Sequence, residues 1–92
     1  MTEGDHQLVI APAARRQLAE RLPEPVAFAA YEFIVGALLA NPQRVGKRLQ
    51  PPLQDRHCAR RGTYRVIYRI DEQNRRVTVV AVTHRSDAYR TP

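Results

Sequence analysis

The chain has 92 residues, of which 43% are hydrophobic, and a formal net charge of +6. This size and composition predict a single domain over residues 1–92 with a core of its own, and they exclude general disorder. The single cysteine, Cys58, excludes an internal disulfide framework and fits a reducing compartment.

The start of the chain and its longest apolar run argue against export and membrane insertion. The first seven residues are polar and carry Glu3 and Asp5, where a signal peptide would be positively charged. The apolar run from Val26 to Ala40 contains Glu32 and is too short to span a bilayer. We therefore expect a cytoplasmic protein with no membrane partner.

The first predicted elements are a short strand, Gln7 to Ala11, and a helix that follows it. Pro12 ends the strand and suits the first turn of a helix. Apolar side chains then recur at steps of three and four residues, at Ala11, Ala14, Leu18 and Leu22. Pro23 and Pro25 end this helix and allow another to begin.

The second predicted helix, Val26 to Ala40, is apolar on nearly all sides, and Asn41-Pro42 ends it. A helix with this pattern is covered on more than one side. The first helix and a sheet can supply that cover, and an outside partner can complete it.

Residues 43–69 hold nearly all of the excess charge, with eight basic side chains against one acid, Asp55. Seven of the eight are arginines, whose planar guanidinium groups fit phosphate oxygens and stack on bases. This concentration is typical of a chain that binds a polyanion. The candidate RNA-binding residues are Arg44, Lys47, Arg48, Arg56 and Arg60, most of them in a basic loop predicted over residues 43–56.

Two strands are predicted after this loop. Thr63 to Ile70 alternates cleanly, and Arg76 to Thr83 is rich in β-branched residues and apolar on both faces, as a central strand is. A polar turn over residues 71–74 joins them. The first strand directs Tyr64, Val66, Tyr68 and Ile70 one way, and Thr63, Arg65, Ile67 and Arg69 the other. Arg65 therefore lies away from the main core face and can point at a ligand.

The strand register decides which side chains join Arg65. If the turn pairs Ile70 with Arg75, Arg65 lies opposite Val80 and shares its face with His84. A slip by one residue places Arg85 there instead. Ser86 and Asp87 can then cap a last helical turn. The side chains that this pocket would gather are Arg61, Arg65, His84 or Arg85, and Tyr89.

The sequence lacks the side-chain patterns of metal sites and of several other kinds of catalytic site. No second cysteine or histidine lies at ligand spacing from Cys58, so no metal site and no cofactor are predicted. The acids are scattered, and there is no glycine-rich phosphate loop and no Ser-His-Asp pattern. Of the histidines, His84 is a better candidate for proton transfer than His57.

The runs ARRGTYRVIYRID and VTHRSDAYR together resemble the RelE toxins of bacterial toxin–antitoxin pairs, within the wider RelE/ParE superfamily. The resemblance implies an α+β fold, with an N-terminal strand, a helical hairpin packed on a small and mostly antiparallel sheet, and a short C-terminal helical turn. It implies a ribonuclease that cuts messenger RNA in the ribosomal decoding site without a metal. It also implies a cognate antitoxin, RelB-like or Phd-like, that wraps the toxin along exposed helix and sheet-edge surface.

The resemblance also implies roles for individual residues. The arginine of the Y-R-[VL]-[VI]-Y motif falls on Arg65, and the later arginine and tyrosine of the family fall on Arg85 and Tyr89. His84 matches the position of a histidine in some members. Several members carry a basic pair on the strand before this motif. There the chain offers Arg56, Arg60 and Arg61 and has Cys58 at one of the matching places, which leaves the general base unassigned.

Cleaving RNA without a metal requires activation of the 2′-hydroxyl, positive charge at the phosphate, and a proton for the leaving 5′-oxygen. Arg65 and Arg61 can supply the charge. His84 is the candidate for proton transfer because arginine stays protonated, and Tyr89 can stack on the scissile nucleotide. Two alternatives stay open, a ParE-like inhibitor of DNA gyrase without catalysis and an RNA- or ribosome-binding module without chemistry.

Overall fold

Five strands form one sheet in the order β1-β5-β4-β3-β2. Only β1 (Gln7–Ile10) runs parallel to its neighbour, β5 (Arg76–His84). The antiparallel pairs join β5 to β4 (Tyr64–Asp71), β4 to β3 (His57–Arg61), and β3 to β2 (Lys47–Arg48). The computed structural model describes residues 6–84, so the predictions for Arg85, Tyr89 and a C-terminal helical turn lie outside the described residues.

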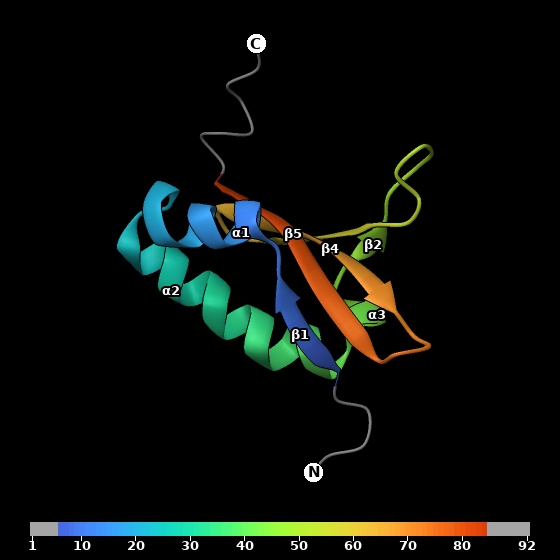
Figure 1. Ribbon diagram of the computed structural model, residues 1–92. Coiled ribbons are helices and arrows are strands. Elements are labelled where there is room, and N and C mark those ends of the chain that lie inside the picture. The colour runs from blue at the N-terminus through green and yellow to red at the C-terminus, as the bar shows by residue number, and fades with distance from the viewer. Residues whose placement is uncertain (1–5, 85–92) are drawn as a thin grey trace.

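Two helices form a second layer beside the sheet (Figure 1). α1 (Pro12–Arg16) continues as the π-helical turn η1 (Gln17–Arg21), and α2 (Glu24–Phe33) continues as the π-helical turn η2 (Ile34–Leu38). Each α-helix has a proline in its first turn, where a missing N–H group leaves no hydrogen bond unmade. The predicted helical hairpin on a mostly antiparallel sheet is confirmed. Within residues 6–84, no helix has the length and apolar character needed to cross a membrane.

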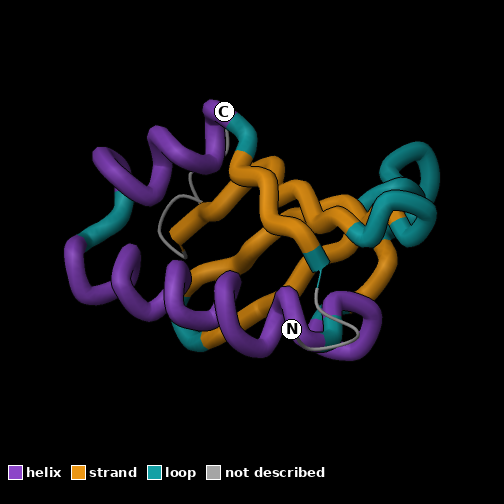
Figure 2. Tube along the Cα trace, turned by 60° about the horizontal axis from the view of Figure 1, so that its bottom comes forward, coloured by secondary structure: helices purple, strands orange, loops and turns teal. Residues whose placement is uncertain are grey.

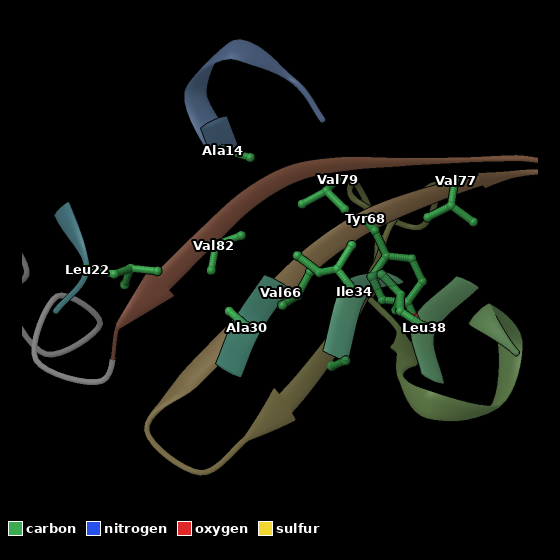
Figure 3. Packing of buried hydrophobic residues seen from close by; sticks show 11 residues of the cluster. Ala14, Leu22, Ala30, Ile34, Leu38, Val66, Tyr68, Val77, Val79 and Val82 are labelled. Atoms are coloured by element: carbon green, nitrogen blue, oxygen red, sulfur yellow. The ribbon is translucent and has the colours of Figure 1, made fainter. Parts of the chain in front are cut away.

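The core lies between this helical layer and one face of the sheet, the helix face (Figure 3). Its strand members alternate along β3, β4 and the two ends of β5, as side chains of a half-covered sheet do. The buried apolar residues are Ala14, Leu22, Ala30, Ile34, Leu38, Ala59, Val66, Tyr68, Val77, Val79 and Val82. The predicted core face of the strand over residues 63–70 is therefore confirmed.

The predicted basic loop over residues 43–56 contains two short elements that the sequence pattern did not indicate. α3 (Pro42–Val45) leads through Gly46 into the two-residue strand β2. A Cβ atom at Gly46 would lie 2.5 Å from the Tyr68 hydroxyl oxygen and 2.9 Å from the Cys58 carbonyl oxygen. Glycine therefore allows β2 to approach the sheet this closely. The rest of the loop projects from the sheet (Figures 1 and 2).

The turn between β4 and β5 differs from the predicted turn by one residue. Asp71 pairs with Arg76, so the connection is residues 72–75 rather than 71–74. Arg75 adopts a φ of 49°, in the left-handed region that closes such turns. The Asp71 carboxylate accepts hydrogen bonds from the backbone and side-chain nitrogens of Asn74, which fixes the turn in this form.

A β-bulge then shifts the register of β4 and β5 once more, between Ile67 and Tyr68. Arg65 consequently lies opposite Thr83, and the predicted pairing of Arg65 with Val80 is wrong. Val80 has no partner in the register, because the residues on either side of it pair with Ile67 and Tyr68. The alternation within each strand was predicted correctly, whereas the pairing between strands was not.

Candidate nucleic-acid interface

The strand residues that alternate with the core residues form a second surface of the sheet, the open face. On β2 to β5, cross-strand pairing assigns to it Lys47, Cys58, Arg60, Arg65, Ile67, Arg69, Asp71, Arg76, Thr78, Ala81 and Thr83. Five of these eleven residues are cationic, and Asp71, next to the β4–β5 turn, is acidic. The helices of residues 6–84 pack on the other face, and on the open face Asp55 of the projecting loop lies 4.0 Å from Arg69, at the end of β4 away from Arg65.

Arg60 and Arg65 are direct partners across β3 and β4. Cα atoms of such partners lie about 4.5–5.5 Å apart, so the two guanidinium groups leave the sheet side by side. Like charges directly opposite destabilise a strand pair. Neither arginine forms an ion pair within residues 6–84, which leaves both charges available to an anion. The prediction that Arg65 points away from the core is confirmed.

Lys47 and Cys58 form the neighbouring pair on the open face, across β2 and β3. Cys58 is two residues before Arg60, a distance of about 7 Å along a strand. Lys47 is exposed and Cys58 is half-buried. The sequence did not indicate this arrangement, because a two-residue strand has too few positions to show alternation.

Arg61 lies on the opposite side of the sheet from Arg65. It pairs with Tyr64 on the helix face, and its guanidinium carbon lies 4.7 Å from the centroid of the Phe33 ring. This contact is a cation–π interaction with α2. The structure therefore does not bring Arg61 and Arg65 to one face, because consecutive residues of β3 point to opposite faces and Arg60 is the partner of Arg65.

His84 also lies on the helix face, as the cross-strand partner of Tyr64. The expectation that it shares the face of Arg65 is therefore wrong. The shift at the turn moves the pairing by two residues, which keeps the face of each side chain. The bulge moves it by one more residue, which reverses the face. The alternative register, which assigned that place to Arg85, concerns a residue outside the described range.

The other candidate RNA-binding residues are divided among several surfaces. Arg48 pairs with His57 on the helix face, where burial and the nearby Arg48 charge lower the pKa of His57 from its usual 6.5. Arg56 is half-buried in the projecting loop, 3.9 Å from the Asp55 carboxylate, and Arg44 is exposed on α3. Lys47 and Arg60 are the two that share the open face with Arg65.

A hollow of about 510 Å³ lies at the other end of β4, near the β4–β5 turn. Its lining mixes both signs of charge, since it includes Arg69 and Arg76 together with Asp55, Asp71 and Glu72. Hydrogen bonds from Asn74 lower the pKa of Asp71 and keep it ionised, which disfavours a polyanion there. Within residues 6–84, no three histidine, cysteine or carboxylate side chains are placed to hold a metal ion.

Comparison with known proteins places this chain among bacterial toxins. Residues 8–89 match a family described as the ParE toxin of type II toxin–antitoxin systems, parDE. Toxin RelE of Mycobacterium tuberculosis is 47% identical over 85 residues, which cover 92% of this chain and 86% of that toxin. Toxin RelG of the same organism is 47% identical over 77 residues, which cover 84% of this chain and 87% of RelG.

The solved structures agree with the sequence relatives. A chain of the M. tuberculosis toxin–antitoxin complex RelBE2 superimposes with a TM-score of 0.86 at 40% identity, over 94% of this chain and 98% of the other. The two chains thus share one fold over nearly the whole length of each. The resemblance noted from the arginine and tyrosine motifs is confirmed: the chain belongs to the RelE/ParE superfamily and is a toxin of a type II toxin–antitoxin system.

Proposed function

We propose that this toxin is an endoribonuclease that cleaves messenger RNA on the ribosome without a metal ion, and so stops translation and growth. The similarity to RelE toxins supports this choice within the superfamily. The concentration of arginine in residues 43–69 supports a polyanionic substrate. The toxin acts in the cytoplasm, where its substrate is translated.

The observation that carries the proposal is the Arg60–Arg65 pair on the open face. When a 2′-oxygen attacks the adjacent phosphorus, the phosphate becomes crowded and gains negative charge. Two adjacent guanidinium groups held by a rigid sheet stabilise that charge without reorganising. The reacting phosphate carries more negative charge in the transition state than in the bound substrate, so the two guanidinium groups hold the transition state more strongly than the substrate.

The ribosome supplies the geometry in this proposal. Holding the 2′-oxygen in line with the phosphorus contributes a large part of the rate gain in such reactions. The open face supplies charge on β3 and β4, whereas a decoding site holds the message in a fixed conformation. This division of work makes the toxin dependent on a translating ribosome.

The test is to substitute Arg65→Ala and express the variant without antitoxin. We expect cells to keep growing and message cleavage on purified programmed ribosomes to fall by about 10²–10³-fold. Arg69→Ala is the matched control, since it removes an arginine from the same strand and the same face but from the far end. Cleavage by Arg69→Ala should stay near that of the unsubstituted toxin. Equal toxicity of Arg65→Ala and the unsubstituted toxin would remove the proposed site.

A second candidate function is inhibition of DNA gyrase without catalysis, which the match to the ParE family description favours. Both functions use the same fold, so the fold does not distinguish them. Two measurements made after expression of the toxin distinguish the two functions. Shortened messages with normal plasmid supercoiling support the ribonuclease, and intact messages with altered supercoiling support the gyrase inhibitor.

We also propose that a cognate antitoxin, RelB-like or Phd-like, binds this toxin. The solved relative at 40% identity is described as a toxin–antitoxin complex. The outer side of α2 and its continuation η2 presents Phe28, Tyr31 and Val35, which are 66%, 49% and 42% exposed. They lie at steps of three and four residues and form one stripe. An antitoxin that covers this stripe would complete the cover of a helix that is apolar on nearly all sides.

A further inference from the structure

We infer that Lys47 is the general acid of this toxin, the group that protonates the leaving 5′-oxygen when RNA is cleaved. The inference rests on the proposed ribonuclease function and assigns a catalytic residue within it. It depends on the pairing of β2 with β3 and on the faces to which the titratable side chains point.

The cleavage reaction needs a proton donor that the arginines cannot supply. Arg60 and Arg65 stabilise charge, but a guanidinium group stays protonated throughout. The described histidines are in other places. His57 and His84 lie on the helix face, and His6 contacts Glu72 at the turn between β4 and β5. Within residues 6–84, the open face next to the arginine pair therefore offers Lys47 and Cys58.

Lys47 has the better chemistry of these two residues for donating a proton. A lysine carries its proton as an ammonium group with three donors on a flexible four-carbon stem. It is exposed and forms no ion pair within residues 6–84, so no carboxylate there holds it away from a substrate. It is also the only lysine of the chain, in which fourteen of the fifteen basic residues are arginine.

The sheet places Lys47 within reach of a phosphate at the arginine pair. β2 lies next to β3, and adjacent strands are about 4.8 Å apart. Lys47 is level with Cys58, which is two residues from Arg60 on the same face. Gly46 keeps this short strand against the sheet, because any side chain there would collide with Tyr68 and Cys58. The lysine backbone is therefore held in place while its side chain is free to extend over the open face.

The proposed step balances as follows. The 2′-oxygen loses its proton to water and bonds to phosphorus, and the bond from phosphorus to the 5′-oxygen breaks. The Lys47 ammonium gives its proton to that 5′-oxygen, and the resulting amine takes a proton back from water. The products are a 2′,3′-cyclic phosphate and a 5′-hydroxyl, and no oxidant, reductant or metal ion enters the balance.

The experiment compares two messages on programmed ribosomes, one with the natural 5′-oxygen at the cleavage site and one with a bridging 5′-sulfur. A thiolate leaves without being protonated, so the sulfur message does not need a general acid. We expect Lys47→Ala to cleave the oxygen message about 10²–10⁴-fold more slowly and the sulfur message at the rate of the unsubstituted toxin. Lys47→Arg keeps the charge but not the proton transfer, so it should show the same pattern.

The controls separate this inference from the function on which it rests. Arg65→Ala should lose cleavage of both messages, because both need charge stabilisation. The inference is overturned if Lys47→Arg cleaves the oxygen message as fast as the unsubstituted toxin, or if Lys47→Ala is equally slow on both messages. If the unsubstituted toxin cleaves neither message, the proposed function itself fails. Thermal unfolding of each variant checks the fold, which an exposed side chain should not affect.

Discussion

Two tyrosines on the same face of β4 show how burial decides what a hydroxyl group contributes. Tyr68 is fully buried, and its hydroxyl donates a 2.6 Å hydrogen bond to the Pro42 carbonyl oxygen. Burial raises the pKa of Tyr68 to about 12, so this hydroxyl remains a donor at every physiological pH. The Tyr64 hydroxyl donates a longer bond, 3.3 Å, to the Ala29 carbonyl oxygen in an exposed setting.

We predict that Tyr68→Phe lowers the free energy of unfolding by about 1–3 kcal/mol, because it leaves the buried Pro42 carbonyl without a donor. Urea unfolding monitored by circular dichroism measures the change. Tyr64→Phe is the matched control and should cost much less, since water can replace the lost partner of Ala29. Equal losses in the two variants would show that burial does not set the value of this hydrogen bond.

His57 should make the stability of this toxin depend on pH. Burial first, and the Arg48 charge second, lower the pKa of the folded His57 below its usual 6.5. A group whose pKa is lower in the folded state gives its full stability above the unfolded pKa. The free energy of unfolding should therefore fall as the pH drops below about 6.5 and through the lower folded pKa. His57→Gln should reduce this dependence in urea titrations between neutral and acid pH. If the free energy of unfolding of His57→Gln changes with pH as much as that of the unsubstituted toxin, other groups cause the dependence.

At this scale the sequence indicated Arg65 as a side chain outside the core, and it did so through strict alternation with Val66 and its neighbours. It could not place Arg61, whose face follows from the pairing of β3 with β4, or His84, whose face is reversed by the bulge between β4 and β5. Alternation is local to a strand, whereas a bulge is set by how two strands fit together. The roles of Arg85 and Tyr89 remain predictions.

At the scale of the elements, two glycines should respond in opposite ways to the same substitution. Gly62 closes the turn between β3 and β4 with a φ of 57°, and Gly36 lies within the helical turn η2. No heavy atom lies within 4 Å of a Cβ at either position, so crowding does not contribute. Only the backbone conformation differs between the two positions.

We predict that Gly62→Ala destabilises the fold by about 1–2 kcal/mol, because a left-handed φ is unfavourable for alanine. Gly36→Ala should stabilise it by about 0.5–1 kcal/mol, because alanine loses less backbone entropy in a helix. The midpoints of chemical unfolding of the two variants and the unsubstituted toxin show whether each substitution raises or lowers stability. Two variants that shift in the same direction would contradict this assignment of backbone conformations.

The sequence predicted the order and type of the longer elements, including the two helices and the strands around residues 63–83. The residue pattern missed α3 and β2, because neither is long enough to show a period. It also missed β3, whose two buried positions hold His57 and Ala59 rather than β-branched or large apolar residues. Gly46 was the one signal available near α3 and β2. Its meaning depends on Tyr68, which is distant in sequence, so the close approach could be recognised only in the folded chain.

At the scale of the whole molecule, the stripe of Phe28, Tyr31 and Val35 should distinguish binding from folding. We predict that Phe28→Ser weakens the complex with the cognate antitoxin by at least about 1–2 kcal/mol, as truncation of an apolar anchor does. The free energy of unfolding should change little, because the side chain is 66% exposed. Titration calorimetry and urea unfolding measure the two quantities.

Ala29→Ser is a suitable comparison variant, since Ala29 is also exposed on α2 but lies outside the stripe. It should leave both quantities unchanged. Antitoxin affinity that is the same for Phe28→Ser and for the unsubstituted toxin would place the antitoxin on another surface.

The parallel pairing of β1 with β5 determines when a newly made chain can fold. β1 leaves the ribosome early in synthesis, but its partner is the last strand that the structure describes. At 5–20 residues per second, a nascent chain waits several seconds between the two. The sheet is complete only when nearly all of the protein has emerged. A ribosome therefore finishes most of the work of making this toxin before the toxin has acquired its native sheet.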